Sequence, residues 1–364
     1  MKRAILSVLL LLSLLLGVSA LRRLPGDSAY LVEEKYDSWT GVLRIWVTES
    51  AAIGGVSPMS WLNACAAQME KAHSGVYCSF RMVPDEALGE PTLYPPDVIV
   101  YTDGLLANHD RLAEIGPELP LRAELRQSNY AVPIAISPCF LIYRTSGGLP
   151  ADLIGTTVAC EERRLDALTA LCTGLRSENA PAQVLPGLDL GLEGSVVSTP
   201  APIGNVRCRV GSGLILTDAP RKAFLDRTAD VFVGDASDLR AMADVSGWAA
   251  ASPGNMVWAD RVLLCSIVDR QDGQRADLCR ELIGLLLTDG QKTISRISAF
   301  PAVDSVGAWT TGPQASLEAA LDGKPCLAPS FFGVWDSLSA ARRYIEGTLT
   351  ADEAAKLLAP RNGT

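Results

Sequence analysis

Apolar and polar residues follow each other in the first third of the chain in patterns that predict alternating strands and helices. The run Val42–Val47 is rich in β-forming residues, and Val76–Met82 carries apolar residues at every second position, so both predict strands. Between them, apolar residues recur at helical spacing over Met59–Met69, with Ser57 as the expected N-cap. Asp97–Tyr101 is apolar after its first residue and predicts a fully buried strand.

The middle of the chain repeats this alternation with other residues. Leu153–Cys160 and Ala229–Asp235 predict strands, while Arg163–Leu175 and Ala236–Met242 predict the helices that follow them. Between these pairs, 177–215 is rich in Gly, Pro and Ser, and we expect it to be irregular.

The last third of the chain predicts helices. They are expected over Arg275–Leu287, Gln291–Ile297, Leu338–Glu346 and Ala351–Leu358, the last beginning with a capping box at Thr350. Strands that alternate with helices indicate an α/β fold with doubly wound sheets. In such sheets, ligands bind at the carboxyl ends of the strands.

Length and charge limit the classes of protein that fit. The chain has 364 residues, which corresponds to about two domains at ~100–200 residues each. Its 48% apolar and 20% charged residues argue against intrinsic disorder. Its formal net charge of −9 would repel a phosphate backbone, so we do not expect a nucleic-acid partner.

The first twenty residues have the order of an export signal. Lys2 and Arg3 precede an uncharged, mostly apolar run over Ala4–Ala20, which ends in the small residues expected at a cleavage site. The run of 17 residues also reaches the lower limit for a spanning helix, and Arg22 and Arg23 are unusual just after a cleavage site. Residues 1–20 are therefore a cleaved signal peptide or an uncleaved membrane anchor, and either one predicts an extracytoplasmic protein.

The nine cysteines do not form a recognisable framework. They occupy positions 65, 78, 139, 160, 172, 208, 265, 279 and 326, and no two lie within four residues of each other. This spacing excludes the C-x-x-C elements of redox sites and zinc knuckles. We expect mostly buried thiols, with one or two disulfides left open, and neither a bound metal nor a cofactor.

Catalytic motifs are also missing from the sequence. Only His73 and His109 are present, in different predicted elements, so a Ser-His-Asp or Cys-His device would depend on one of them. The sequence contains no G-x-S-x-G, H-E-x-x-H, S-x-x-K or P-loop motif. Acidic pairs such as Asp235 and Asp238 fit helix starts better than acid-base chemistry. We predict that the protein is not an enzyme.

Four parts of the chain carry a resemblance to a known family. Tyr130–Ala135 followed by Cys139–Arg144 is similar to that family's Tyr-x-Val-Pro and Leu-x-Tyr-Asn crossover between lobes. Asp230–Met242, Leu282–Ala302 and Glu346–Ala354 are similar to three of its later elements. The sequence thereby resembles the extracellular solute-binding proteins of ATP-driven importers. Within them it is similar to the branch with the type II periplasmic-binding fold, which includes maltose- and oligosaccharide-binding proteins.

The resemblance implies an α/β protein of two doubly wound lobes joined by a hinge, with C-terminal helices. It places chain crossovers near 137–143 and 258–266. The implied parts are 24–138 plus 262–305 as lobe 1, 139–261 as lobe 2, and 306–364 as a C-terminal helical segment packing across the lobes. The chain departs from the family pattern at Arg144, Asp235 and Ser298, where Asn, Trp and Gly are usual.

The function implied by the resemblance is solute capture. Such a protein holds a small solute, with carbohydrate favoured, in a cleft between the lobes and delivers it to the permease subunits of an ABC transporter. We expect a monomer, which would contact the cell membrane through the N-terminal segment if that segment is uncleaved. A membrane-anchored sensing module of the same fold is the alternative, and a secreted hydrolase is a weaker one.

Eight residues are candidates for contact with the solute. Strand ends, the first crossover and the aromatic side chains that could stack on sugar rings supply them: Glu49, Ser50, Tyr101, Asp103, Ser137, Asp235, Trp248 and Trp258. Asp103 fits a turn-forming Asp-Gly equally well, and Asp235 fits a helix N-cap. We place Trp248 and Trp258 in loops near the second crossover.

Overall fold

The computed structural model divides the chain into two units, Met1–Gly41 and Val42–Thr364. It describes residues 39–89, 94–116, 119–122, 125–147, 156–165, 167–168, 214–252, 257–270, 272–324, 326–328, 331–332, 339–341, 343, 348–349, 353 and 357. The predicted export signal, the irregular segment up to residue 213 and most of the two C-terminal helices lie outside these residues. Within the described part, no helix is long and apolar enough to cross a membrane.

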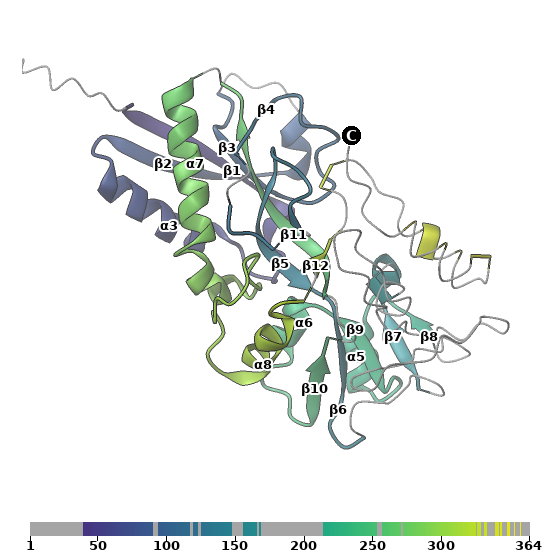
Figure 1. The fold of residues 1–364 in the computed structure, drawn as a ribbon. Helices are drawn as coiled ribbons and strands as arrows, with labels where there is room; N and C mark the ends of the chain where they lie inside the picture. Colours follow the sequence, from purple (N-terminus) through teal and green to yellow (C-terminus); the bar gives the residue numbers. More distant parts are fainter. Residues whose placement is uncertain are drawn as a thin grey trace, which may run out of the picture. The chain divides into compact units, whose positions relative to one another are not determined.

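The first lobe is built around a seven-stranded sheet (Figure 1). Its order is β12-β11-β3-β1-β2, and β4 and β5 also pair with β11. β1 and β3 run parallel, whereas β11 runs antiparallel to β3 and to β5. The strands are β1 (Gly41–Thr48), β2 (Val76–Val83), β3 (Val98–Thr102), β4 (Leu112–Ala113), β5 (Val132–Pro138), β11 (Val257–Val268) and β12 (Cys326–Leu327).

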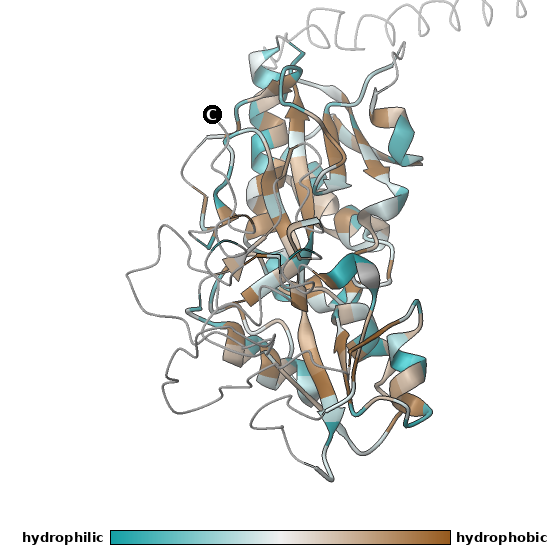
Figure 2. Cartoon of the chain, turned by 90° about the vertical axis from the view of Figure 1, so that its right-hand side faces the viewer, coloured by the Kyte–Doolittle hydropathy of each residue, from teal (hydrophilic) through white to brown (hydrophobic). Residues whose placement is uncertain are grey.

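The second lobe is built around a five-stranded sheet of order β10-β6-β9-β7-β8. β7 is parallel to both β8 and β9, while β6 is antiparallel to β9 and β10. Its strands are β6 (Phe140–Arg144), β7 (Val158–Cys160), β8 (Leu214–Leu216), β9 (Val231–Gly234) and β10 (Trp248–Ala251). Figure 2 shows that the strands of both sheets are largely hydrophobic, as buried strands require.

Helices complete both lobes. α3 (Met59–Ala72) and α7 (Gly273–Leu287) lie side by side in the first lobe (Figure 1). α3 buries Leu62, Cys65, Ala66 and Met69, as its helical spacing predicts, and also Trp61, whereas Met59 is only partly buried. The other helices in the described residues are α5 (Pro220–Leu225), α6 (Ala236–Ala241), α8 (Gly312–Leu321) and the 3-10 turns η1 (Glu49–Ala51), η2 (Asp85–Gly89), η4 (Glu162–Arg164) and η5 (Gln291–Ile297).

Three details of the helices differ from the prediction. Pro58 occupies the N-cap position of α3 instead of Ser57, whose hydroxyl accepts a long bond from the Met59 amide at 3.4 Å. Gln291–Ile297 forms a 3-10 helix, and it ends at Ser298 with a left-handed φ of 56°. η4 replaces the first turn of the helix predicted from Arg163 onward.

The chain connects the two sheets at two places, and only the first of them lies wholly within the described residues. A single residue, Cys139, separates β5 from β6, and its amide donates to the carbonyl oxygen of Trp258 at 2.8 Å. The return passage lies between Ala251 at the end of β10 and Val257 at the start of β11. β11 lies entirely in the first sheet, so the crossover predicted near 258–266 is several residues too late. The domain boundaries themselves stay a prediction.

Strand directions bring the carboxyl edges of the two sheets together. The carboxyl ends of β1, β3 and β5 share one edge of the first sheet with the amino end of β11. The carboxyl ends of β7 and β9 share an edge of the second sheet with the amino end of β6. Since only Cys139 separates β5 from β6, these two edges face each other. We call this region, with the residues directly after those strand ends, the interlobe junction.

Candidate functional site

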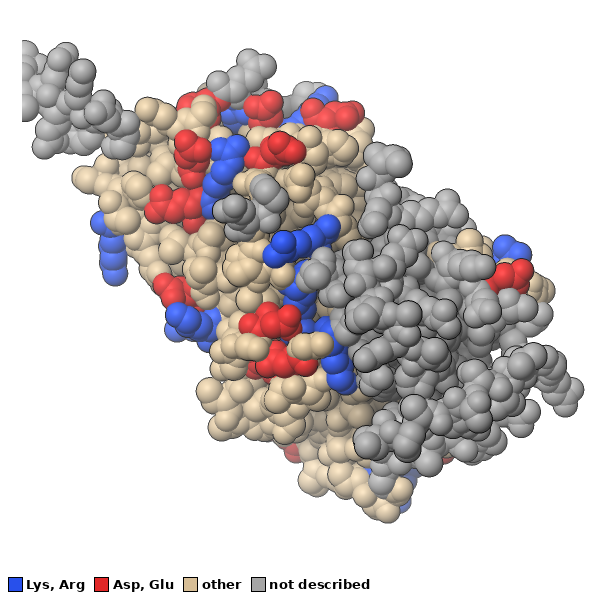
Figure 3. All heavy atoms as spheres, in the orientation of Figure 1, with Lys and Arg blue, Asp and Glu red and all other residues tan. Residues whose placement is uncertain are grey.

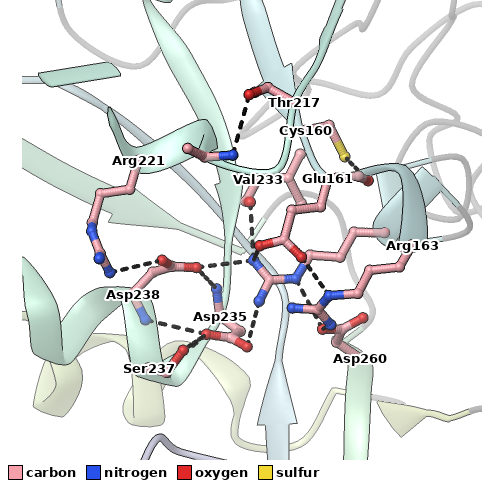
Figure 4. Close-up of polar contacts among 12 residues, drawn as sticks. Cys160, Glu161, Arg163, Thr217, Arg221, Val233, Asp235, Ser237, Asp238 and Asp260 are labelled. Atoms are coloured by element: carbon pink, nitrogen blue, oxygen red, sulfur yellow. Dashed lines mark hydrogen bonds and ion pairs between the residues drawn. The ribbon is translucent and has the colours of Figure 1, made fainter. Parts of the chain in front are cut away.

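Asp235, Asp238 and Asp260 gather around one arginine at the interlobe junction (Figure 4). The side chain of Arg164, in η4, is 2% exposed. It donates to Asp235 at 2.6 Å, to Asp238 at 2.9 Å and to Asp260 at 3.1 Å. It also donates to the carbonyl oxygen of Val233 at 3.4 Å. One guanidinium therefore ties η4, β9 and α6 of the second lobe to β11 of the first.

Local backbone structure aims each carboxylate at Arg164. Asp235 is the N-cap of α6 and forms a capping box with Asp238, so both side chains are fixed at the end of β9. Asp260 lies at a register shift of β11, between Ala259 paired with Pro138 and Arg261 paired with Ser137. Such a bulge leaves one residue out of the sheet register, which turns Asp260 toward the second lobe.

The charges in this network change one another's proton affinity. Burial alone would lower the pKa of Arg164, but Asp235 and Asp260 raise it above its ordinary value. For Asp235, burial acts to raise the pKa, and Arg164 outweighs it, so this carboxylate stays ionised. Burial raises the pKa of Asp238 and of Asp260, although Arg164 opposes the rise in both.

Two further arginines take part at the rim. Arg221 donates to Asp238 at 3.3 Å, and Arg163 pairs with Glu161 and with Asp260. Acidic and basic side chains are likewise interspersed over the described part of the face in Figure 3. Each carboxylate of the network therefore has at least one arginine as a partner.

Longer polar contacts join the lobes beside this network. Arg261 of β11 donates to Asp235 at 3.4 Å and to the carbonyl oxygen of Ile53 at 3.5 Å. Arg240 of α6 donates to the Ser298 hydroxyl at 3.4 Å. These contacts are at the long end of hydrogen-bond geometry, so they hold the lobes together weakly.

Four predicted residues come together at this junction on the first-lobe side. Ser50 bonds the hydroxyl of Thr102 at 3.0 Å and donates to Asp85 at 3.0 Å, while Glu49 beside it is exposed in η1. Asp103 accepts from the Val262 amide at 2.7 Å. Ser137 is opposite Arg261 in the register of β5 and β11.

Asp103 combines a structural contact with an unusual proton affinity. Its carboxylate and amide bond the two backbone groups of Val262, which fixes the turn that follows β3. Burial raises the pKa of Asp103 from 3.8 to about 7, against the lowering effect of the Val262 amide. Asp103 therefore exchanges its proton near neutral pH.

Two predicted site residues are core residues instead. Tyr101 is fully buried, and its hydroxyl bonds the hydroxyl of Ser266 at 3.0 Å, because alternation along β3 turns it into the apolar core. Trp258 is 1% exposed and lies within β11, where its neighbours Val257 and Ala259 are also buried. The prediction that Trp258 lies in a loop is wrong, and both rings are buried.

Trp248 also lies in a strand, at the end of the second sheet that is far from the interlobe junction. It begins β10 and pairs with Arg144, the last residue of β6, whereas Phe140 at the start of β6 marks the junction. Four residues of strand separate the two ends by about 13 Å. Its indole donates to the carbonyl oxygens of Met242 and Val245, so Trp248 packs against the end of α6.

The sequence leaves two roles open for Asp235, a residue of the site or a helix N-cap. It is a helix N-cap, and its buried carboxylate also pairs with Arg164 at the junction.

Sequence reasoning missed Arg164, Asp260 and Arg261. The separations between Arg164 and its partners, up to 96 residues, leave no local pattern. The available signal is the charged pair Asp260 and Arg261 within the run from Val257 to Val268, whose other residues are apolar except Ser266.

Known proteins resemble this chain in fold rather than in sequence. No family model and no curated protein matches the sequence. Solved structures match over most of the chain. The maltodextrin-binding protein MalE1 from L. casei BL23, without ligand, has a TM-score of 0.61 at 11% identity, covering 88% of this chain and 97% of that chain. The cyclic alpha-maltosyl-1,6-maltose binding protein from Arthrobacter globiformis has a TM-score of 0.57 at 12% identity, with the same coverage.

The GacH receptor of Streptomyces glaucescens GLA.O gives a similar result, with a TM-score of 0.54 at 16% identity over 88% of this chain and 97% of that chain. At such identities the likeness establishes the fold. The chain therefore has the two-lobed α/β fold of the maltose- and oligosaccharide-binding proteins, as its sequence predicts.

Proposed function

We propose that this protein is an extracytoplasmic solute-binding protein, which captures a small solute, with a saccharide favoured, between its two lobes. It then delivers the solute to the permease subunits of an ABC transporter. The single observation that carries this proposal is the meeting of two carboxyl sheet edges at a junction crossed by short chain segments. This is where open α/β sheets bind ligands.

The structural neighbours support the saccharide as the solute class. They include a maltodextrin-binding protein, a cyclic maltosyl-maltose binding protein and a receptor whose structure was solved in complex with acarbose. The match covers 97% of each of these neighbours. A saccharide offers hydroxyl groups, which Ser50, Asp103 and Glu49 at the junction can bind.

The contacts between the lobes suit a hinge. Arg164 and Asp260 form a buried pair close to the chain crossings, where the lobes move least during closure. The pairs Arg240 with Ser298 and Arg261 with Asp235 are longer and more exposed, so they can break and reform at small cost. A solute that contacts both lobes then shifts the population toward the closed form, which a permease can recognise.

Acid-base catalysis is a poorer use of this junction. Each carboxylate of the Arg164 network is already paired with an arginine, and Asp103 is bonded to the Val262 backbone. A general acid or base needs a free position beside the reacting group. The arrangement therefore favours binding over chemistry.

Thermal denaturation of the full chain with a panel of solutes tests the proposal. The panel contains neutral oligosaccharides, acidic saccharides, sugar phosphates, amino acids and short peptides. A solute at 100 times its dissociation constant stabilises the folded state by about 2.7 kcal/mol, which raises Tm measurably. We expect at least one saccharide to do so. A shift produced by amino acids or peptides alone would contradict the saccharide, and no shift with any class would contradict solute capture.

A further inference from the structure

Three polar atoms at the interlobe junction are buried without a hydrogen-bond partner. They are the hydroxyl oxygen of Ser137, Nε1 of Trp258 and Nε of Arg261. Ser137 is 0% exposed, and Trp258 is 1% exposed. Buried polar groups in native proteins nearly always have a partner, so three such atoms in one short stretch of two paired strands require an explanation.

The strand register places these atoms on one face of the first sheet. Ser137 and Arg261 are direct cross-strand partners, so their side chains share a face and start about 5 Å apart. Ala259 pairs with Pro138, and the register shift at Asp260 puts Ala259 on the opposite face. Alternation along β11 then returns Trp258 to the face of Arg261. All three atoms can donate a hydrogen bond, so they call for an acceptor.

Arg261 also has positive charge that its neighbours do not fully use. A guanidinium has five N–H donors, and those of Arg261 make two long contacts, to Asp235 at 3.4 Å and to Ile53 at 3.5 Å. The same Oδ2 atom of Asp235 accepts from Arg164 at 2.6 Å, so its charge is already shared. The side chain of Arg261 is 32% exposed, which leaves it within reach of a solute.

The other acidic groups nearby face elsewhere or hold a proton. Asp260 accepts from Arg164 and Arg163, and Asp238 accepts from Arg164 and Arg221. Asp103 bonds the Val262 amide, and its pKa is raised to about 7. Arg261 therefore has donors to offer to a new acceptor, and one of them, Nε, is buried without a partner.

We infer that Ser137 and Arg261 form a subsite for an oxyanion of the solute, a carboxylate or a phosphate, with Trp258 as a third donor. This inference rests on the proposed function and narrows it from a saccharide in general to an acidic one. Arginine suits the role because its planar fork matches the two oxygens of a carboxylate or phosphate. A neutral saccharide would leave the long contact to Asp235 as the ion pair of Arg261.

Matched pairs of solutes test the inference on the full chain by calorimetry and thermal denaturation. Uronic-acid oligosaccharides are compared with the neutral oligosaccharides of the same linkage, and sugar phosphates with their parent sugars. We expect the acidic member of a pair to bind and its neutral counterpart to bind at least tenfold more weakly. The two kinds of pair distinguish a carboxylate from a phosphate. The affinity should also fall as salt is added.

Variants identify the residues. Arg261→Gln should weaken binding of the acidic solute by about 10- to 100-fold, which corresponds to the loss of a hydrogen bond to a charged group. It should leave weak binding of the neutral counterpart unchanged, an outcome that a purely structural role would not give. Ser137→Ala should weaken binding of the acidic solute by about 3- to 10-fold. Arg81→Gln, which removes the same charge on exposed β2, is the matched control and should change nothing.

Several outcomes would overturn the inference. The inference is overturned if a neutral saccharide binds more tightly than its acidic counterpart. It is also overturned if the acidic solute binds Arg261→Gln with unchanged affinity. If Arg261→Gln does not fold, Arg261→Lys and Ser137→Ala carry the test, and equal affinity in both would overturn the inference. Binding of neutral saccharides alone removes the subsite but leaves the proposed function intact. Binding of no solute removes both.

Discussion

Replacing Arg164 by methionine tests how much the interlobe network contributes to stability. The substitution keeps an unbranched side chain but removes the charge that holds Asp235, Asp238 and Asp260. Protonating one buried carboxylate whose ordinary pKa is about 3.9 costs roughly 4 kcal/mol at pH 7, at 1.36 kcal/mol per pH unit. Loss of one partner from a buried ion pair costs a similar amount, about 3–5 kcal/mol. We therefore expect the free energy of unfolding to fall by about 4 kcal/mol at pH 7.

The pH dependence separates this mechanism from a packing defect. Arg164 lowers the pKa of Asp235, so in the natural protein this pair adds stability above the unfolded pKa and loses it as pH falls through the folded pKa. Without Arg164 the buried carboxylates prefer the protonated form. The deficit of the variant should therefore shrink by about 1.4 kcal/mol for each pH unit between pH 7 and pH 4.

Urea denaturation followed by circular dichroism, at pH 7, 6, 5 and 4, provides the measurement. Arg163→Met is the matched control, since the neighbouring side chain is 49% exposed and should cost less than about 1 kcal/mol. The reasoning is refuted if both variants lose the same stability at pH 7. It is also refuted if the deficit of Arg164→Met is the same at pH 4 and pH 7.

Three further predictions follow from single residues. Gly54→Ala should destabilise the protein by about 1–3 kcal/mol in thermal or urea denaturation, because its Cβ would lie 2.5 Å from the carbonyl oxygen of Ser298. Asp103→Asn should gain stability relative to the natural protein as pH rises from about 4 to 7, in urea titrations, since burial raises the pKa of Asp103 to about 7 and only the natural side chain then ionises. Cys78, although partly exposed, should react slowly with a maleimide at pH 8 in the native state and rapidly in denaturant, as mass spectrometry would record, because burial raises its pKa to about 12. Buried Cys265 should be unreactive until the protein unfolds.

Each of these predictions has its own control. Gly89→Ala should be almost neutral, because no atom lies within 4 Å of the added Cβ, and an equal loss in both glycine variants would contradict the steric argument. For Asp103, a constant difference between the two proteins from pH 4 to pH 8 would contradict a raised pKa. For the cysteines, rapid native labelling of Cys265 would contradict its burial.

Local sequence patterns predict those strands and helices whose burial follows from their own apolar spacing. Val42–Val47, Val76–Met82 and Asp97–Tyr101 overlap β1, β2 and β3, because alternation or continuous apolarity reflects how each strand is buried. Six of the seven described cysteines are buried, which agrees with the expected burial of most of them. Cys172 and Cys208 lie outside the described residues.

The junction was harder to predict because its partners are far apart in sequence. The place of Asp235 at a strand end makes it a candidate, but nothing near Arg164 indicates that it meets Asp235 71 residues later. The aromatic rings of Trp248 and Trp258 make them candidates in the sequence, but strand pairing decides where those rings lie. The order of the segments could be recognised from sequence, whereas the side chains at the junction depend on tertiary contacts.

A crystal structure of the full chain with the best solute from thermal denaturation tests the central claim most directly. We predict electron density for the solute at the interlobe junction, in contact with residues of both lobes. Density bound to one lobe alone, or on the surface away from the carboxyl ends of the strands, would contradict solute capture between the lobes.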